Sequence, residues 1–142
     1  MKAADVASYI LAVKGEMSAM KLQKLVYYSQ AWSLVWDDRP MFDESFEAWA
    51  NGPVCPTLYE QHKGRFLVTA RTFDGNPDDL DDDARETIDS VLNFYGDKEA
   101  QWLSDLTHSE RPWLDARIGV PLGARCNNEI TIAAMAEYYS SL

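Results

Sequence analysis

The chain has 142 residues, of which 46% are hydrophobic and 12% aromatic, a composition that is typical of a folded domain and excludes a disordered chain. No apolar run approaches the roughly 20 residues that a membrane-spanning helix needs, and no signal peptide is recognisable, so we expect one cytoplasmic domain over residues 1–142, with no membrane partner. The formal net charge of −10 lies entirely in residues 73–142, and a field of this sign repels nucleic acid and attracts basic partners.

Two helices are predicted at the start of the chain. Apolar residues at helical spacing over 6–13 predict the first, and Gly15 can end it in a left-handed conformation. Ser18 is a suitable N-cap for the second. Its apolar stripe runs over 22–36 before Pro40, which predicts a helix of roughly 18 residues.

The pattern then becomes that of short strands. Residues 42–50 alternate loosely between apolar and polar and predict a strand, and Asn51-Gly52-Pro53 predicts a turn. A short helix over 56–63 and a second strand over 66–69 follow. Two strands joined through a helix would form a small flap and not a full sheet.

The rest of the chain is predicted to be helical. A polar, acidic stretch over 74–83 leads into a helix that ends at Gly96, and Asp97 can cap the next helix. A brief helix begins near Pro112, and a loop over 119–127 precedes a last helix over 130–139, for which Asn128 is the expected cap. The predicted fold class is mainly α (α+β): a compact helical domain of about six helices with a small two- to three-stranded antiparallel β element.

No metal or cofactor site is predicted. A calcium-binding loop that begins at Asp74 would place Arg85 at the twelfth position, where a bidentate glutamate is needed. The residues suited to zinc, which include no close cysteine pair, are Cys55, His62, His108 and Cys126. No glycine-rich phosphate-binding motif is present either.

Nucleophilic catalysis has one weak candidate, so we expect that the protein is not an enzyme. Cys55 falls at a predicted helix start, where the helix dipole can lower a thiol pKa. Either His62 or His108 would have to act as the base, and nothing in the sequence indicates that either histidine reaches the thiol. A small apolar filler is the commoner role for such a cysteine. His108 is interpreted as part of a structural loop that docks Trp113 into the core.

Four linked motifs indicate a family. The segment Leu22-Gln23-Lys24-Leu25-Val26-Tyr27-Tyr28 resembles the LQKLxYY signature of the Panacea, or SocA-like, antitoxin domain, which also occurs in phage-associated proteins. The segment 46–54 resembles that family's EAWxxGPV segment, and Tyr59 stands where the following helix usually has tyrosine. Leu106-Thr107-His108 with Pro112-Trp113 is similar to the family's LTH…PW pattern. The resemblance covers nearly the whole chain.

The resemblance implies an antitoxin of a toxin–antitoxin system. Such a protein neutralises a cognate protein toxin by direct binding, and it can also act as an adaptor that delivers the toxin to a host AAA+ protease. Some relatives carry an added DNA-binding region, for which this chain has no spare residues, so nucleic acid is not an expected partner. Cys55 departs from the family, which more often has an apolar or acidic residue there.

The motif residues are the expected contact points for the partner. Because Leu22, Leu25 and Val26 face the core, Gln23, Lys24 and Tyr27 are expected nearer the flank of the helix. The full set of expected partner-binding residues is Gln23, Lys24, Tyr27, Trp49, Pro53, Val54, Tyr59, His108 and Trp113. The alternative is that Trp49, Gly52 and Pro53 only lock the corner between strand and helix.

A second hypothesis concerns the acidic run. Between Asp74 and Asp89, eight acidic residues face only Arg85, and a phage or mobile-element protein could use such a surface to imitate nucleic acid and inhibit a host protein. The simpler interpretation is a solvated helix start beside a loop.

Overall fold

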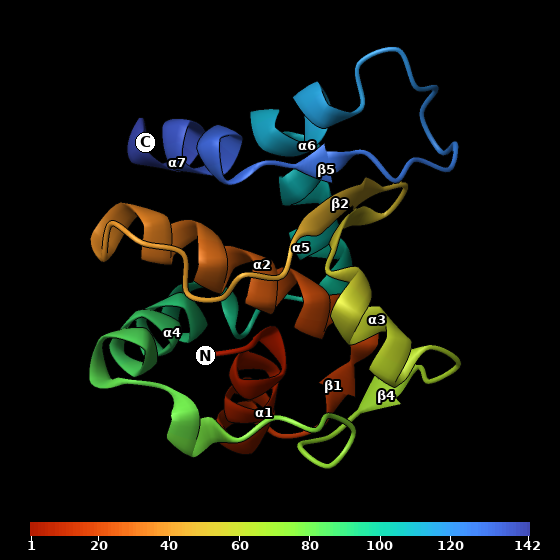
Figure 1. Ribbon diagram of the computed structural model, residues 1–142. Coiled ribbons are helices and arrows are strands. Elements are labelled where there is room, and N and C mark those ends of the chain that lie inside the picture. Colours follow the sequence, from red (N-terminus) through yellow and green to blue (C-terminus); the bar gives the residue numbers. More distant parts are fainter.

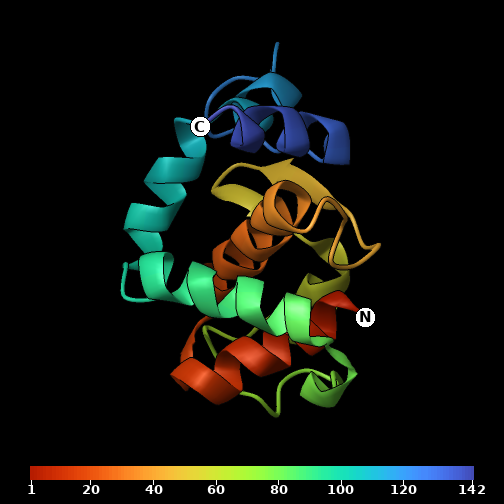
Figure 2. The ribbon, with the colours of Figure 1, turned by 90° about the vertical axis from the view of Figure 1, so that its left-hand side faces the viewer.

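A long central helix organises the fold. The computed structural model describes residues 1–142, and in it α2 (Ala19–Trp36) packs against α1 (Ala3–Lys14), α4 (Asp82–Tyr95), α5 (Ala100–His108) and α7 (Ile132–Ser140). In Figure 1 α2 crosses the middle of the molecule, and Figure 2 shows α7 above it, α4 and α1 below it and α5 at its side. Thirty-four buried apolar residues form one core cluster around it. No helix combines the length and apolar character that crossing a bilayer requires.

The first two helices have the predicted ends. Gly15 follows α1 with a φ of +83°. The Ser18 hydroxyl accepts a hydrogen bond from the Lys21 amide (3.1 Å) and caps α2, which has the expected 18 residues. Helix α2 is covered on nearly all sides, so its buried residues include polar ones such as Gln23, Lys24 and Gln30.

The strands pair differently from the prediction. Strand β2 (Phe46–Trp49) pairs antiparallel with β3 (Gly52–Val54) through a two-residue turn, and its other edge pairs with β5 (Glu129–Ile130). The predicted flap of 42–50 with 66–69 is therefore wrong: β4 (Leu67–Val68) pairs with β1 (Met17–Ser18) in a separate two-stranded sheet. Pro53 fits within β3 because this is an edge strand, where a missing N–H removes no ladder bond.

The remaining helices confirm the mainly α class with small differences. There are seven α-helices, which include the short α3 (Pro56–His62) and α6 (Arg111–Ala116), and a 3-10 turn, η1 (Pro77–Asp79). The prediction that Asp97 caps α5 is wrong: Glu99 is the residue before α5, and Asp97 pairs with Lys14 (2.9 Å). Thr131 caps α7, while Asn128 donates to the Ala116 carbonyl (3.0 Å). The prediction of Asn128 as the cap is wrong because β5 occupies the start of the predicted helix.

Candidate functional site

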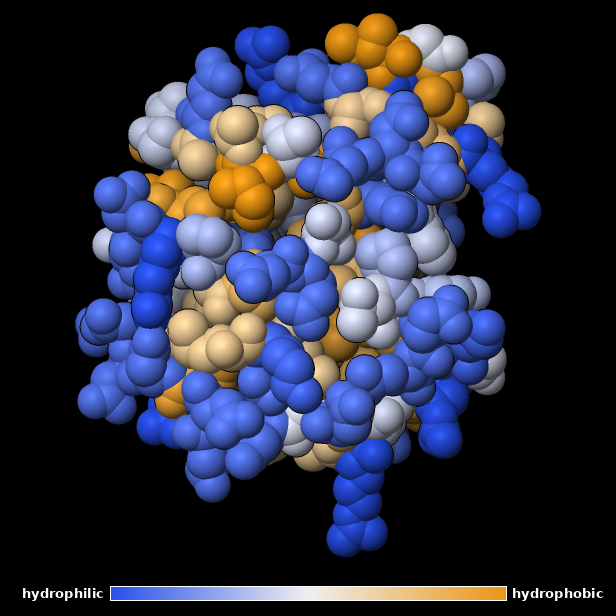
Figure 3. Space-filling model, viewed as in Figure 1, coloured by the Kyte–Doolittle hydropathy of each residue, from blue (hydrophilic) through white to orange (hydrophobic).

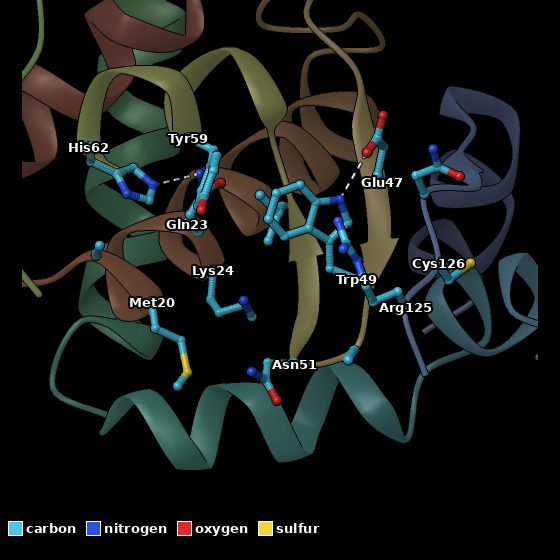
Figure 4. Close-up of a pocket in the computed structure, with 14 residues that line it drawn as sticks. Met20, Gln23, Lys24, Glu47, Trp49, Asn51, Tyr59, His62, Arg125 and Cys126 are labelled. Atoms are coloured by element: carbon cyan, nitrogen blue, oxygen red, sulfur yellow. Dashed lines mark hydrogen bonds between the residues drawn. The ribbon is translucent and has the colours of Figure 1, made fainter. Parts of the chain in front are cut away.

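One open pocket collects the motif residues. It has a volume of about 750 Å³ and lies where the first turns of α2, the β2–β3 hairpin, α3 and the segment 125–127 meet (Figure 4). The lining side chains come from four parts of the chain: Ala19, Met20, Gln23 and Lys24; Glu47, Trp49, Ala50, Asn51 and Val54; Tyr59 and His62; and Arg125, Cys126 and Asn127. The base is thus built by the two motif segments, and one rim by a loop distant in sequence.

Five of the nine expected partner-binding residues line this pocket: Gln23, Lys24, Trp49, Val54 and Tyr59. The other four, Tyr27, Pro53, His108 and Trp113, do not line it. Gln23, Lys24 and Tyr27 are expected nearer the flank of α2 than its core-facing residues, but each is only 1% exposed, as deeply buried as the core. The reason is that β3 and α7 also pack on α2 and cover most of that flank.

Gln23 fastens α3 to α2 beneath the pocket. Its side-chain oxygen accepts from the Cys55 amide (2.9 Å), and its nitrogen donates to the Cys55 carbonyl (3.2 Å) and contacts His62 Nε2 (3.0 Å; Figure 4). Burial lowers the pKa of His62, so the imidazole is neutral at pH 7 and can accept from the amide through Nε2. Gln23 is therefore a positioning residue that fixes the helix carrying Tyr59.

Lys24 places a buried amine at the base of the pocket. Its Nζ donates to the Pro53 carbonyl (3.2 Å), and no carboxylate lies within ion-pair distance. Burial lowers the pKa of Lys24 to about 7. Gly52, with a φ of +123°, packs against this side chain: a β-carbon there would collide with Lys24 Cε and lie 3.0 Å from Thr107 Oγ1. Gly52 thus leaves room for the amine.

Two aromatic rings form a wall above Lys24. Trp49 and Tyr59 meet edge to face, with ring centroids 4.9 Å apart, and both are partly exposed. The Trp49 indole N–H donates to Glu47 (2.8 Å), which holds that carboxylate against the wall (Figure 4). Rigid aromatic groups at an open surface are suited to anchor a partner.

Trp113 and His108 support the hairpin from behind. Trp113 is 2% exposed, and its indole N–H donates to the Trp49 carbonyl (2.9 Å). The His108 imidazole stacks on it at 4.0 Å and 15°. The predicted docking of Trp113 into the core is confirmed, and helix α6 brings it there. The prediction that His108 belongs to a loop is wrong, because His108 is the last residue of α5.

Tyr27 belongs to a buried polar cluster. The Tyr139 hydroxyl lies 3.2 Å from that of Tyr27, and both Tyr28 and Tyr139 donate to Glu110 Oε1 at 2.7 Å. Burial raises the pKa of Glu110, and the two hydroxyl groups oppose this by stabilising its anion. The cluster joins α2, α7 and the start of α6, and so supports the core.

The sequence does not predict the role of Arg117, which holds in place the loop that forms one rim of the pocket. Arg117 is buried, and its guanidinium donates to the carbonyls of Ala48 (2.9 Å), Pro121 (3.1 Å) and Ala124 (2.8 Å). It also lies over the Trp113 ring, 5.0 Å from the centroid. These contacts tie the loop after α6 to β2 and bring Arg125 to the pocket. A single arginine near the end of the predicted brief helix gives no signal of this role.

The side chains considered for chemistry form no hydrogen bond with one another. Cys55 is fully buried at the start of α3, and burial raises the pKa of its thiol to about 11. No hydrogen bond joins this thiol to His62 or His108, since His62 contacts Gln23 and His108 stacks on Trp113. No three His, Cys, Asp or Glu side chains converge as a metal site would require.

The acidic run lies on and next to η1 and α4, which do not line the pocket. All eight of its acidic residues are exposed. Two of them also serve the fold. Asp81 caps α4 through the Ala84 amide (2.9 Å) and binds the Arg39 guanidinium with both oxygens (2.8 and 2.7 Å), and Asp89 accepts from the Tyr9 hydroxyl (2.7 Å).

Comparison with known proteins identifies relatives. The sequence model of the family described as "Antitoxin SocA-like, Panacea domain" matches residues 22–114, a range that includes the base and the aromatic wall of the pocket but not segment 125–127. Antitoxin SocA of Caulobacter vibrioides (strain NA1000 / CB15N) is 31% identical over 109 residues, which cover 68% of this chain and 58% of that relative. The chain therefore spans less than two thirds of the relative's length. No solved structure matches the chain.

Proposed function

The chain belongs to the SocA-like Panacea domain family, and we propose that it is an antitoxin that neutralises a cognate protein toxin by binding it directly. One observation carries this proposal: the two motif segments at 22–28 and 46–54 meet at one open pocket with Trp49 and Tyr59 at its wall. If the motifs only stabilised the core, they would not need to border a surface opening of this size.

The surface beside the pocket supports a binding role. Ile118 and Leu122 are 79% and 86% exposed on the loop after α6, and Figure 3 shows the apolar cluster that this loop forms at the upper right of the molecule. Apolar side chains grouped on a surface are typical of protein–protein contacts. The pocket and this loop share one rim, because the loop continues into Arg125 and Cys126. We therefore place the toxin over both.

We also propose that the chain acts by binding alone and is not an enzyme. The thiol of Cys55 is buried with a raised pKa, and a thiol in that state is a poor nucleophile. The imidazoles of His62 and His108 are engaged with Gln23 and Trp113. These positions favour structural roles for all three side chains.

A growth-rescue experiment tests the proposal. The product of the adjacent reading frame is expressed alone and together with this chain, and growth is measured. We expect toxicity that the wild-type chain cancels and that Trp49→Ala no longer cancels. Trp102→Ala is the matched control, since Trp102 is a partly exposed tryptophan on α5 outside the pocket. Failure of the wild-type chain to restore growth against any toxic neighbour would contradict an antitoxin role.

Two finer expectations belong to this proposal. The first, which comes from the sequence, is that the chain works in the cytoplasm, and the second, which comes from the family resemblance, is that it delivers the bound toxin to a host AAA+ protease. The half-life of the toxin in growing cells, measured with and without the chain, tests the second. A half-life shortened by the chain supports an adaptor role, whereas an unchanged half-life indicates neutralisation by masking alone.

The exposure of the acidic run favours a second candidate function, inhibition of a host protein by imitation of nucleic acid. Asp79, Asp82 and Asp83 are the residues to change to asparagine, because Asp81 caps α4 and its loss would destabilise the helix. This function predicts a salt-sensitive complex with a basic host protein that the triple variant weakens. Binding that is unaffected by salt and by the variant would exclude it.

A further inference from the structure

Building on the proposed function, we propose that the pocket receives a carboxylate of the bound polypeptide and that Lys24 is the cation that holds it. Figure 4 shows the Lys24 side chain running from α2 into the space bordered by Met20, Asn51 and Trp49. The amine lies at the base, and the pocket opens from it to solvent.

The hydrogen bonding of Lys24 is incomplete. An ammonium group has three donors, and the only acceptor within reach is the Pro53 carbonyl at 3.2 Å. The residue is 1% exposed, so water cannot satisfy the other donors in the way it does at a surface. A buried cation without a counter-ion is costly, and the cost falls when an anion enters beside it. An anion can approach this amine through the pocket, because Lys24 is one of its lining residues.

The other charged and titratable groups around Lys24 favour a monoanion. Glu47 on β2 is turned toward the Trp49 indole, and Arg125 on the rim forms no ion pair. His62 on α3 and His108 on α5 have lowered pKa values, with burial as the main cause and Lys24 as a further one. With Lys24 protonated and both histidines neutral, the charges of Lys24, Arg125 and Glu47 sum to +1. A carboxylate neutralises that charge, whereas a phosphate dianion would overcompensate it and be repelled by Glu47.

The proposal has a pH signature with a definite sign. The pKa of Lys24 is about 7 in the free protein, and a carboxylate beside it would raise that pKa because it stabilises the ammonium form. Above pH 7 the amine must take up a proton as the carboxylate binds. Affinity therefore falls as the pH rises, by up to roughly tenfold per pH unit. A ligand held by apolar contacts alone shows no such dependence.

Phenylacetate is a suitable probe because its ring can contact Trp49 and Tyr59 while its carboxylate reaches Lys24. Binding is followed by NMR through the Trp49 indole N–H and the Lys24 Cε resonances at pH 6.5, 7.5 and 8.5. We expect weaker binding at each higher pH, a raised Lys24 pKa in the complex, and at least tenfold weaker binding of the uncharged 2-phenylethanol. Equal binding of the two compounds, or no shift with either, would overturn the proposal.

A pair of variants repeats the test. Lys24→Met replaces the amine by an unbranched apolar side chain that is one atom shorter and suited to a buried position, so the fold should persist, which circular dichroism checks. It should lose phenylacetate binding at least tenfold, whereas Lys63→Met, which changes an exposed lysine of a surface ion pair, should not. If Lys24→Met binds phenylacetate as the wild type does, the assignment of Lys24 is wrong.

Two blocked peptides separate the sources of the carboxylate. One carries a central glutamate and an amidated end, and the other carries a free C-terminal carboxylate and no acidic side chain. We expect one of them to bind with the pH dependence of phenylacetate, and binding of neither would remove the polypeptide as the source. In the growth-rescue assay, full protection by Lys24→Met would overturn this proposal and leave the antitoxin role standing. Probe binding that depends on Lys24, without protection by the wild-type chain, would refute the antitoxin role alone.

Discussion

Replacing Gly52 by alanine tests how the base of the pocket is built. Gly52 has a φ of +123°, a conformation that costs a residue with a side chain about 1–3 kcal/mol. The new β-carbon would also collide with Lys24 Cε and press on Thr107 Oγ1 at 3.0 Å. Because Lys24 is the flexible partner, its side chain must swing into the pocket and lose its bond to Pro53, which adds about 1 kcal/mol. The expected loss of unfolding free energy is about 2–4 kcal/mol.

Gly64→Ala is the matched control. Gly64 also has a positive φ, +85°, but nothing lies within 4 Å of a β-carbon placed there. This variant therefore carries the backbone cost alone. Urea denaturation of both variants at pH 7 gives the difference, which reports the displacement of Lys24.

A second measurement isolates the amine. In the wild type, Lys24 loses its proton near pH 7 when folded but near 10.5 when unfolded, so the unfolded state binds more protons between these values. Stability should therefore gain from this group as the pH rises above 7, by at most about 1.4 kcal/mol per pH unit. In Gly52→Ala the amine reaches water, its pKa rises, and the gain shrinks. A variant with the stability of Gly64→Ala and the wild-type pH dependence would refute this reasoning.

Two further predictions concern the supports of the pocket. Arg117→Met removes hydrogen bonds to the Ala48, Pro121 and Ala124 carbonyls, so we expect faster amide exchange and faster proteolysis over 118–127 with little change in α2; unchanged exchange there would contradict this. Glu110→Gln keeps an acceptor for Tyr28 and Tyr139, whereas Glu110→Ala leaves buried hydroxyl groups unpaired and should lower the unfolding free energy by about 2–4 kcal/mol. Because burial raises the pKa of Glu110, the wild type should lose stability as the pH rises through that pKa. Glu110→Gln should lack this loss in urea titrations from pH 4 to 8. The same dependence of unfolding free energy on pH in both proteins would contradict this reasoning.

Local sequence signals predicted the helices well, but they did not predict how strands distant in sequence pair with one another. Ser18 and the apolar stripe after it determine α2 within a single stretch of chain, so its start and length could be predicted. Strand β5 has two residues and no alternating pattern of its own; it forms because β2 offers a free edge more than 80 residues earlier. Pro53 argued for a turn, yet an edge strand accepts it.

The sequence predicted some residues of the pocket but not how the pocket is built. Motif resemblance identified Lys24, Trp49 and Tyr59, and the structure brings them together. It could not show that Lys24 is buried, because burial depends on the hairpin and helices that pack over α2 from elsewhere in the chain. Arg125 reaches the rim only through the contacts of Arg117 with carbonyl groups, and backbone acceptors leave no trace in a sequence.

The two charged features of the molecule place different demands on one partner, and salt and pH separate them. The exposed carboxylates after Asp74 act over distances that salt screens, so with the proposed function they should favour a basic toxin, and the association rate of that toxin should fall with ionic strength. Lys24 acts only on a group already inside the pocket, where salt has little effect and protonation decides the affinity. The double variant Asp82→Asn, Asp83→Asn should therefore reduce the salt dependence of toxin binding and leave its pH dependence unchanged. Lys24→Met should remove the pH dependence and leave the salt dependence unchanged. If one variant altered both dependences equally, the two features would form a single contact surface, and the separate assignment of pocket and acidic face would be wrong.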